Sequence, residues 1–344
     1  MLSLPVLVWV GAISYSLYLW HWPILAFIRY ISGPYELNFG QSIVYWVVAF
    51  TLASLSYYLI ERWFRKKNLK FSEKLTWLGL FVFVALTAIF AQKFNKKFVS
   101  PMPVEFTRYA DHATICHGKI VGDCLRGDRN SIEKPILVLG DSHAAMLNYF
   151  FDAIGRELKL SFRVITASSC VTIPGFDYKR IADWAQKSCI EQIEEVNQFL
   201  RTDKVIISSM WNYHLKNDEF KNALRLFLRT STNKKILLLA DIPHFKNYNP
   251  VRAYRFLKIG LGAPLPNIDG SVTVANNNLY NIAQQYQYVD YLNLTDNAMF
   301  KEIPIYKGNL IYSDNHHLNE FGSSLYADSV KESLHAYFDA WLEY

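Results

Sequence analysis

Pro135-Ile-Leu-Val-Leu-Gly-Asp-Ser-His-Ala145 is the stretch of sequence that decides the fold. Its apolar run, Ile136 to Leu139, is typical of a strand buried on both faces of a parallel sheet. The Gly-Asp pair that follows predicts a sharp turn, and Ala144 to Leu158 has the apolar spacing of a helix. Ser142 is therefore expected between the end of a strand and the start of a helix. Free backbone N–H groups at such a place can hold an oxyanion.

A serine at this place is a candidate nucleophile if a general base can reach it. The candidates lie near the other end of the chain, in Tyr312-Ser-Asp-Asn-His-His-Leu-Asn319. Asp314 and His317 are three residues apart, which lets the carboxylate hold one ring nitrogen while the other faces outward. His316 is the alternative base, and its spacing from Asp314 argues against it. Because turns often carry Gly, Asp and Ser for geometry alone, the prediction depends on both motifs together.

Gly140-Asp141-Ser142-His143 and Asp314-x-x-His317 resemble the first and last motifs of SGNH-type hydrolases and acetyltransferases. The resemblance covers roughly residues 134–344. It implies Ser142 as nucleophile, His317 as base and Asp314 as the residue that orients the base. It also implies three oxyanion donors, namely the Ser142 backbone N–H, the Asn212 side-chain amide and the Gly175 backbone N–H. For Asn212, a simple turn residue is the alternative.

Beyond the nucleophile, apolar runs alternate with helical stretches. Further buried strands are expected at 162–166, 204–209, 236–240 and 288–292, and helices at 181–200, 216–228, 272–285 and 320–341. Such alternation predicts a parallel sheet with helices on both faces. The predicted fold class is therefore α/β, an SGNH-hydrolase-like three-layer α/β/α domain over residues 134–344. Asp241 and His244, which follow the fourth strand, are expected to shape the rim of the cleft.

The first part of the chain, residues 1–92, is expected to form about three transmembrane helices. The apolar stretches Leu4–Ile31, Gln41–Ile60 and Leu75–Ala91 are each close to the length that crosses a bilayer. A basic cluster from Arg62 to Lys74 lies between the second and third, and the positive-inside rule places it in the cytoplasm. Everything after roughly Lys93 would then be exported. Three buried helices of a soluble protein are the alternative.

A second resemblance concerns this membrane part. Ile13-Ser-Tyr-Ser-Leu-Tyr-Leu-Trp-His-Trp-Pro-Ile24 and Tyr58-Leu-Ile-Glu-Arg-Trp-Phe-Arg65 resemble late transmembrane segments of acyltransferase family 3 proteins. Those are multi-span enzymes that O-acylate cell-surface glycans, and one subgroup carries an exported SGNH domain. Trp63 stands where that pattern usually has Pro. The early spans of the transacylase core have no counterpart here, so the chain is similar to the C-terminal part of such a protein. The alternatives are a fragment, a truncated reading frame and one half of a split pair.

Residues 93–133 are expected to be a periplasmic linking region. Four cysteines allow three pairings. The simplest joins Cys116 to Cys124 and Cys170 to Cys189, and an oxidising periplasm would favour both disulfides. A zinc site is the competing interpretation. Because the spacings lack a Cys-x-x-Cys pair, no metal site is predicted.

Together these features predict an O-acyltransferase, with acetyl as the expected group, that acts on a glycan such as lipopolysaccharide O-antigen or peptidoglycan through an acyl-serine. The resemblance implies acetyl-CoA as the ultimate donor through a membrane transacylase, no bound cofactor, and a bacterial inner-membrane protein with its C-terminal domain in the periplasm. The net charge of +6 is modest, and the basic residues do not form one long tract of the kind that binds nucleic acid, so no nucleic acid is expected as a partner. The alternatives are an esterase that removes acetyl groups and a catalytically inactive glycan-binding or scaffold module.

Overall fold

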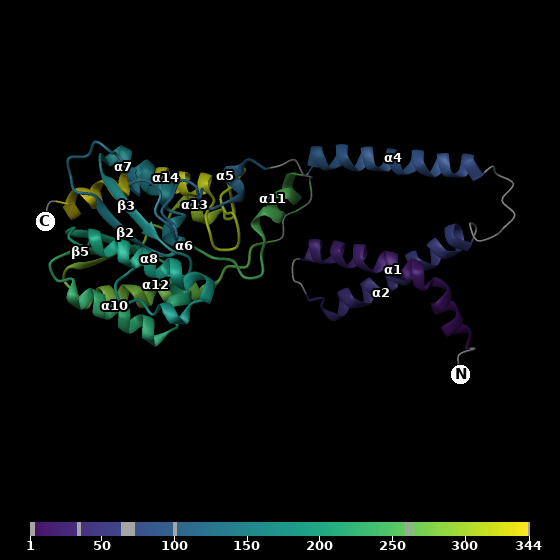
Figure 1. The fold of residues 1–344 in the computed structure, drawn as a ribbon, viewed down its shortest axis with the longest axis horizontal. Coiled ribbons are helices and arrows are strands. Elements are labelled where there is room, and N and C mark those ends of the chain that lie inside the picture. Colours follow the sequence, from purple (N-terminus) through teal and green to yellow (C-terminus); the bar gives the residue numbers. More distant parts are fainter. Residues whose placement is uncertain are drawn as a thin grey trace. The chain divides into compact units, whose positions relative to one another are not determined.

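The computed structural model describes residues 4–32, 36–62, 73–98, 102–258, 260, 262 and 265–342. These residues divide into two compact units, Met1–Ser100 and Pro101–Tyr344 (Figure 1). Each unit is described by itself.

The first unit is helical. It contains α1 (Pro5–Ser32), α2 (Phe39–Ser56), the π-helical turn η1 (Tyr57–Glu61) and α4 (Glu73–Phe98). Asn38 begins α2 with a capping box, because its side chain and that of Gln41 each accept the other residue's backbone N–H. The α1 and α2 helices pack together through Trp9 on Phe50, with ring centroids 6.0 Å apart.

Two helical stretches of this unit are long and apolar enough to cross a membrane, namely Phe39–Glu61 and Trp77–Phe94, each with a mean hydropathy of 1.8. Helix α1, the first of the three expected spans, has 28 residues but is not among them. Its tyrosines, tryptophans, serines and His21 make it less apolar than its length suggests. The predicted orientation of the spans depends on the basic cluster from Arg62 to Lys74. Most of that cluster, residues 63–72, lies outside the described residues.

The second unit is built on a six-stranded sheet in the order β1-β3-β2-β4-β5-β6. Its strands are β1 (Leu125–Gly127), β2 (Ile136–Gly140), β3 (Ser161–Thr166), β4 (Lys204–Ser208), β5 (Lys235–Leu239) and β6 (Val289–Leu292). All neighbours pair in parallel except β1, which lies antiparallel to β3 at the edge. The predicted parallel α/β sheet is confirmed, and β1 adds a strand from within the expected linking region.

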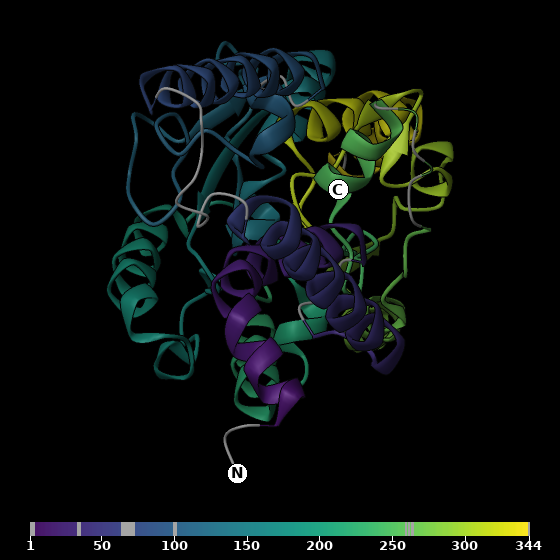
Figure 2. The same cartoon turned by 90° about the vertical axis from the view of Figure 1, so that its right-hand side faces the viewer.

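Helices cover both faces of this sheet, giving the three predicted layers. Figure 1 shows α7 (Asn148–Leu158) and α14 (Glu320–Leu342) on one face, and α8 (Asp183–Phe199), α10 (Asp218–Thr230) and α12 (Gly270–Ala283) on the other. The yellow α14 is also visible in Figure 2. Remaining elements are α5 (Val104–Thr107), α6 (Ser142–Ala145), η2 (Tyr178–Arg180), α9 (Trp211–His214), α11 (Pro250–Lys258), α13 (Ala298–Lys301), β7 (Ile305–Tyr306) and β8 (Asn309–Leu310).

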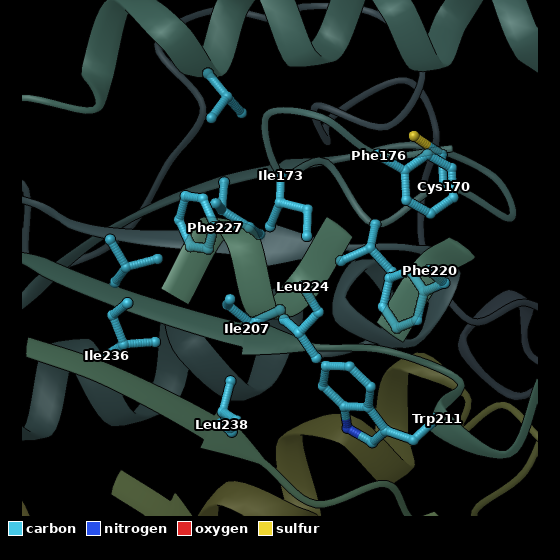
Figure 3. Close-up of a cluster of buried hydrophobic side chains, with 14 of the residues drawn as sticks. Cys170, Ile173, Phe176, Ile207, Trp211, Phe220, Leu224, Phe227, Ile236 and Leu238 are labelled. Carbon is cyan, nitrogen blue, oxygen red and sulfur yellow. The ribbon is translucent and has the colours of Figure 1, made fainter. Parts of the chain in front are cut away.

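The alternation of side chains along each strand divides the core into two clusters. On β2, Leu137 and Leu139 belong to the cluster under α8, α10 and α12, whereas Ile136 and Val138 belong to the cluster under α7 and α14. Figure 3 shows the first cluster, in which Trp211 lies among strand residues and the apolar face of α10. Because β2 is buried on both faces at the centre of the sheet, its C-terminal end is a rigid place for a functional side chain.

Both expected disulfides are present, and the predicted pairing of Cys116 with Cys124 and of Cys170 with Cys189 is confirmed. The backbone carbonyls of Cys116 and Cys124 accept hydrogen bonds from Thr166 and Val164 on β3, at 3.0 Å each. The segment before β2 is therefore fastened to the sheet rather than running freely over it.

Candidate active site

Ser142 lies directly past the end of β2, as the sequence predicts. A Cβ on Gly140 would lie 1.8 Å from the backbone oxygen of Ser208 on β4, so only glycine allows the two strands to approach so closely here. Asp141 then caps α6, because its Oδ1 accepts the His143 N–H at 2.8 Å. Ser142 is thus the first residue of a helical turn at the carboxyl edge of the sheet.

The structure brings Ser142, His317 and Asp314 together from opposite ends of the domain. The His317 Nε2 is 2.8 Å from the Ser142 Oγ, and its Nδ1 is 2.8 Å from Asp314 Oδ2. Asp314 Oδ1 accepts the backbone N–H groups of His316 and His317, at 2.9 and 2.8 Å. The Tyr109 ring stacks on the His317 ring with centroids 4.5 Å apart, which fixes the plane of the imidazole.

Electrostatics favour a neutral imidazole facing the serine. Burial lowers the pKa of His317, and its bond to Asp314 only partly opposes that effect. Burial alone would raise the pKa of Asp314, but the hydrogen bond and charge of His317 hold it well below its usual range. With Asp314 ionised, His317 carries its proton on Nδ1, so Nε2 is free to accept the hydroxyl proton of Ser142.

Asp141 anchors the turn that carries Ser142 to the loop that follows β4. Its Oδ2 accepts hydrogen bonds from the Ser209 hydroxyl at 2.8 Å, the Met210 N–H at 3.0 Å and the His214 Nε2–H at 3.0 Å. Arg180 donates to His214 Nδ1, which leaves the proton of that ring on Nε2. Burial raises the pKa of Asp141, but the bonds from His214 and the charge of His143 outweigh it and hold the pKa far below the usual value. Nothing in the sequence predicts this network.

The structure gives weaker support to the other two expected oxyanion donors, the Asn212 amide and the Gly175 N–H. The Asn212 amide, on α9, donates to the Ser271 hydroxyl at 3.0 Å, and its Oδ1 is buried without a partner among the described residues. Gly175 is exposed, with a φ of +81°, and a Cβ there would meet nothing within 4 Å. In the described part of the chain, no hydrogen bond joins Gly175 or Asn212 to Ser142, so both roles stay predictions.

The sequence does not predict a buried group that lies beside Ser142, His317 and Asp314. His143 is completely buried, with Nδ1 2.7 Å from Asp241 Oδ1 and Nε2 3.1 Å from His316 Nδ1. His244 Nε2 lies 3.0 Å from Asp241 Oδ2, but the angles are not those of a hydrogen bond. The prediction that Asp241 and His244 shape the rim is wrong. Each is only 2% exposed. A hydrogen bond from the Phe245 N–H to Asn315 O holds the loop after β5 against the loop that carries His316.

Two groups of these residues have donor atoms within 4.8 Å of one another, namely His143 with His316 and His317, and His143 with Asp241 and His244. Imidazole and carboxylate are ligands that zinc accepts. Both nitrogens of His143 and of His317 already form hydrogen bonds to protein groups. We therefore interpret the cluster as a proton network, and the expected lack of a metal site stays a prediction.

Comparisons with known proteins identify the second unit. A family model described as "SGNH domain (fused to AT3 domains)" matches residues 108–332. Provisionally named O-acetyltransferases of Staphylococcus aureus are 40% identical (strain COL) and 39% identical (strain MRSA252) over 75 residues. Those matches cover 20% of this chain and 11% of each relative, so the chain spans only a small part of the length of these proteins.

Among solved structures, the periplasmic domain of a Salmonella Paratyphi A lipopolysaccharide acetyltransferase is 14% identical with a TM-score of 0.43, over 70% of this chain and 94% of that domain. The C-terminal catalytic domain of Streptococcus pneumoniae peptidoglycan O-acetyltransferase A is 16% identical with a TM-score of 0.35, over 62% of this chain and 96% of that domain. The family model covers well over half of the chain. The chain therefore belongs to the family of SGNH domains that are fused to AT3 domains.

Proposed function

We propose that the protein is an O-acetyltransferase that acylates a hydroxyl of a cell-surface glycan, with lipopolysaccharide O-antigen and peptidoglycan as the expected classes. The observation that carries this proposal is the hydrogen-bonded chain from Ser142 through His317 to Asp314, at 2.8 Å for each link. Family membership and the provisional names of the Staphylococcus aureus relatives support it.

In the proposed reaction, His317 takes the hydroxyl proton while Ser142 Oγ attacks the carbonyl carbon of the acyl donor. The tetrahedral intermediate collapses, the bond to the leaving group breaks, and His317 returns the proton to that group. The acyl-serine is then attacked by a sugar hydroxyl, whose proton passes to His317. When the Ser142–acyl bond breaks, the proton returns to Ser142 and the acetylated glycan leaves.

The oxyanion of each intermediate would be held by the backbone N–H of Ser142, with the Asn212 amide and the Gly175 N–H as the further expected donors. Removing one such donor typically costs about 3 kcal/mol of transition-state stabilisation. An Asn212→Ala variant that acylates as fast as the wild type would remove Asn212 from this role.

The acetyl group would reach this site from acetyl-CoA through a membrane transacylase of the AT3 type, supplied by a preceding part of the same protein or by a partner. The exposed apolar surfaces of Phe39–Glu61 and Trp77–Phe94 support a place in a bilayer. We propose a multi-pass protein of the bacterial inner membrane, with the SGNH domain in the periplasm, where both disulfides would be stable.

The test uses the full chain in detergent and an activated acetyl ester, with and without an oligosaccharide acceptor. We expect acetylated oligosaccharide from the wild type and none from Ser142→Ala. Hydrolysis alone, at equal rates with and without acceptor, would instead establish the esterase that removes acetyl groups.

Labelling with a serine-directed fluorophosphonate distinguishes the transferase and esterase hypotheses from that of an inactive glycan-binding or scaffold module. Ser142→Ala should abolish stoichiometric labelling. Ser168→Ala is the matched control, because Ser168 follows β3 at the same edge of the sheet and bonds only to His117 among the described residues. An unlabelled wild-type protein would contradict the proposal.

A further inference from the structure

We propose that His316 is a fixed hydrogen-bond donor for the acceptor hydroxyl, and that the buried pair of His143 and Asp241 holds it in one tautomer. In this arrangement His316 touches the substrate, whereas His143 and Asp241 are positioning residues that act through it. The substrate class rests on the proposed function, because a sugar hydroxyl is the acceptor there.

The first step concerns the charge of His143. It is completely buried and its Nδ1 lies 2.7 Å from Asp241 Oδ1. Asn276 fixes the Asp241 backbone by two hydrogen bonds, at 3.0 and 2.9 Å, and the Ile242 N–H bonds to Oδ1 at 2.9 Å. A carboxylate held away from water needs a compensating positive charge. His143 is hydrogen-bonded to it, whereas His244 Nε2 lies 3.0 Å from Oδ2 without forming a hydrogen bond.

The groups around His143 favour its charged form. Burial lowers its pKa, but the charge and hydrogen bond of Asp241, with smaller contributions from Asp141 and Asp314, raise it overall. The neighbouring imidazoles belong to His244, on the loop after β5, and to His316 and His317, on the loop before α14. We therefore take His143 as an imidazolium with a proton on each nitrogen.

The second step concerns where His316 carries its proton. Its Nδ1 lies 3.1 Å from His143 Nε2, and the two ring planes differ by only 3° with centroids 5.3 Å apart. This separation is that of two rings joined edge to edge, which is the orientation of an N–H···N hydrogen bond. Burial and the charges of His317 and His143 lower the pKa of His316 to about 3, so the ring is neutral. Its Nδ1 accepts from His143, and its one proton is on Nε2.

The third step concerns what this donor faces. The His316 ring lies 4.0 Å from the His317 ring between centroids, and the ring is only partly buried. In the described residues, no protein group pairs with its Nε2. Because its other nitrogen is already occupied, His316 cannot serve as a base. It can hold the oxygen of a hydroxyl whose proton points to His317, which orients the acceptor for attack on the acyl-serine.

The tautomer is tested first, by ¹⁵N NMR of the full chain in detergent, labelled only in its histidine rings and assigned by single substitutions. We expect both His143 nitrogens to be protonated, with His316 protonated on Nε2 alone. In Asp241→Asn, whose amide oxygen can still accept from His143, the charge of His143 should be lost and the His316 proton should move to Nδ1. A wild-type His316 protonated on Nδ1 would overturn the proposal. So would spectra changed by EDTA, since they would show a metal between the rings.

The acceptor contact is tested by kinetics in the same preparations. His316→Ala should lower kcat/KM for the oligosaccharide by about tenfold, the worth of one hydrogen bond to substrate, while fluorophosphonate labelling of Ser142 keeps its rate. His316→Gln, which retains an N–H near the Nε2 position, should recover part of the loss. The matched control is His335→Ala, because His335 is an exposed histidine on α14 that pairs with Asp339.

The outcomes separate this proposal from the proposed function. Equal losses of labelling and transfer in His316→Ala would mean that His316 acts through the triad, and would overturn the acceptor role. Wild-type protein that is labelled but only hydrolyses the ester would refute transfer to glycans, and with it the acceptor role. The tautomer measurement would still decide whether His316 is a fixed donor.

Discussion

Substitution of Asp314 by Asn most directly tests the proposal that Asp314 orients His317 as the base. In the structure, Asp314 Oδ1 accepts two backbone N–H groups, from His316 and His317, while Oδ2 accepts the His317 ring N–H. An asparagine can keep both backbone bonds only by placing its oxygen at the Oδ1 position. Its NH₂ group then faces His317 Nδ1, which must become an acceptor. The ring proton moves to Nε2 and points at Ser142, so the base is in the wrong tautomer.

The expected loss follows from this switch. The equivalent change in a serine protease triad leaves the geometry intact and lowers kcat by about ten-thousandfold, which corresponds to about 5.5 kcal/mol of transition-state stabilisation. We expect a similar loss in the rate of acylation of Ser142. Thermal unfolding should change little, because both backbone hydrogen bonds to the side chain remain.

The assay measures release of the leaving group from an activated acetyl ester, and the fluorophosphonate labelling rate, for full-length wild type and variant. Asp339→Asn is the matched control, because Asp339 holds His335 Nδ1 at the same distance of 2.8 Å on the exposed surface of α14. A variant Asp314→Asn that acylates within tenfold of the wild type would refute the assigned role. A large drop in its melting temperature would show instead that Asp314 acts mainly by holding the loop.

Three further predictions concern the same domain. Gly140→Ala should prevent folding, because its Cβ would lie 1.8 Å from a β4 backbone oxygen, whereas Gly270→Ala, whose Cβ meets nothing within 4 Å, should melt like the wild type. As the pH is lowered, the labelling rate should fall only when His317 becomes protonated. Because burial lowers the pKa of His317, the plateau of the pH profile should extend below pH 6.5, the ordinary pKa of histidine. Replacing both Cys170 and Cys189 by Ala should lower the free energy of unfolding, measured by denaturant titration, by about 3 kcal/mol. This is the value expected for a disulfide that closes a loop with a sequence separation of 19.

The parts of the fold that the sequence predicts well are those decided by short-range pattern. The apolar run Ile136 to Leu139 predicts a strand buried on both faces, and the structure places it inside the sheet with every residue buried. Ser142 and the Asp314-x-x-His317 motif were recognisable because each sits at a boundary between elements, where the local backbone fixes the direction of the side chain. Their contact across the domain then follows from the parallel arrangement of the strands.

The parts that could not be predicted depend on packing between distant segments. Strand β1 has three residues, too few for a pattern, and it forms because the segment around the disulfide of Cys116 and Cys124 is fastened to β3. Asp241 was expected at the rim of the cleft, since nothing in the sequence shows that its loop packs against the loop that carries His316. The partner of His143 is 98 residues away, so only the fold reveals that the histidine is paired.

Each residue of the Gly-Asp-Ser-His motif has its own structural role, because the four residues contact four different parts of the domain. Gly140 permits the close approach of β2 to β4. Asp141 faces back to the loop after β4 and accepts three hydrogen bonds on one oxygen, and Ser142 faces His317. His143 faces the loop after β5, where Asp241 holds it. A substitution at the fourth position is therefore expected to act on the proposed acceptor side of the site through His316. It is also expected to raise the pKa of His317, because the two rings lie 4.9 Å apart and the charge of His143 lowers that pKa.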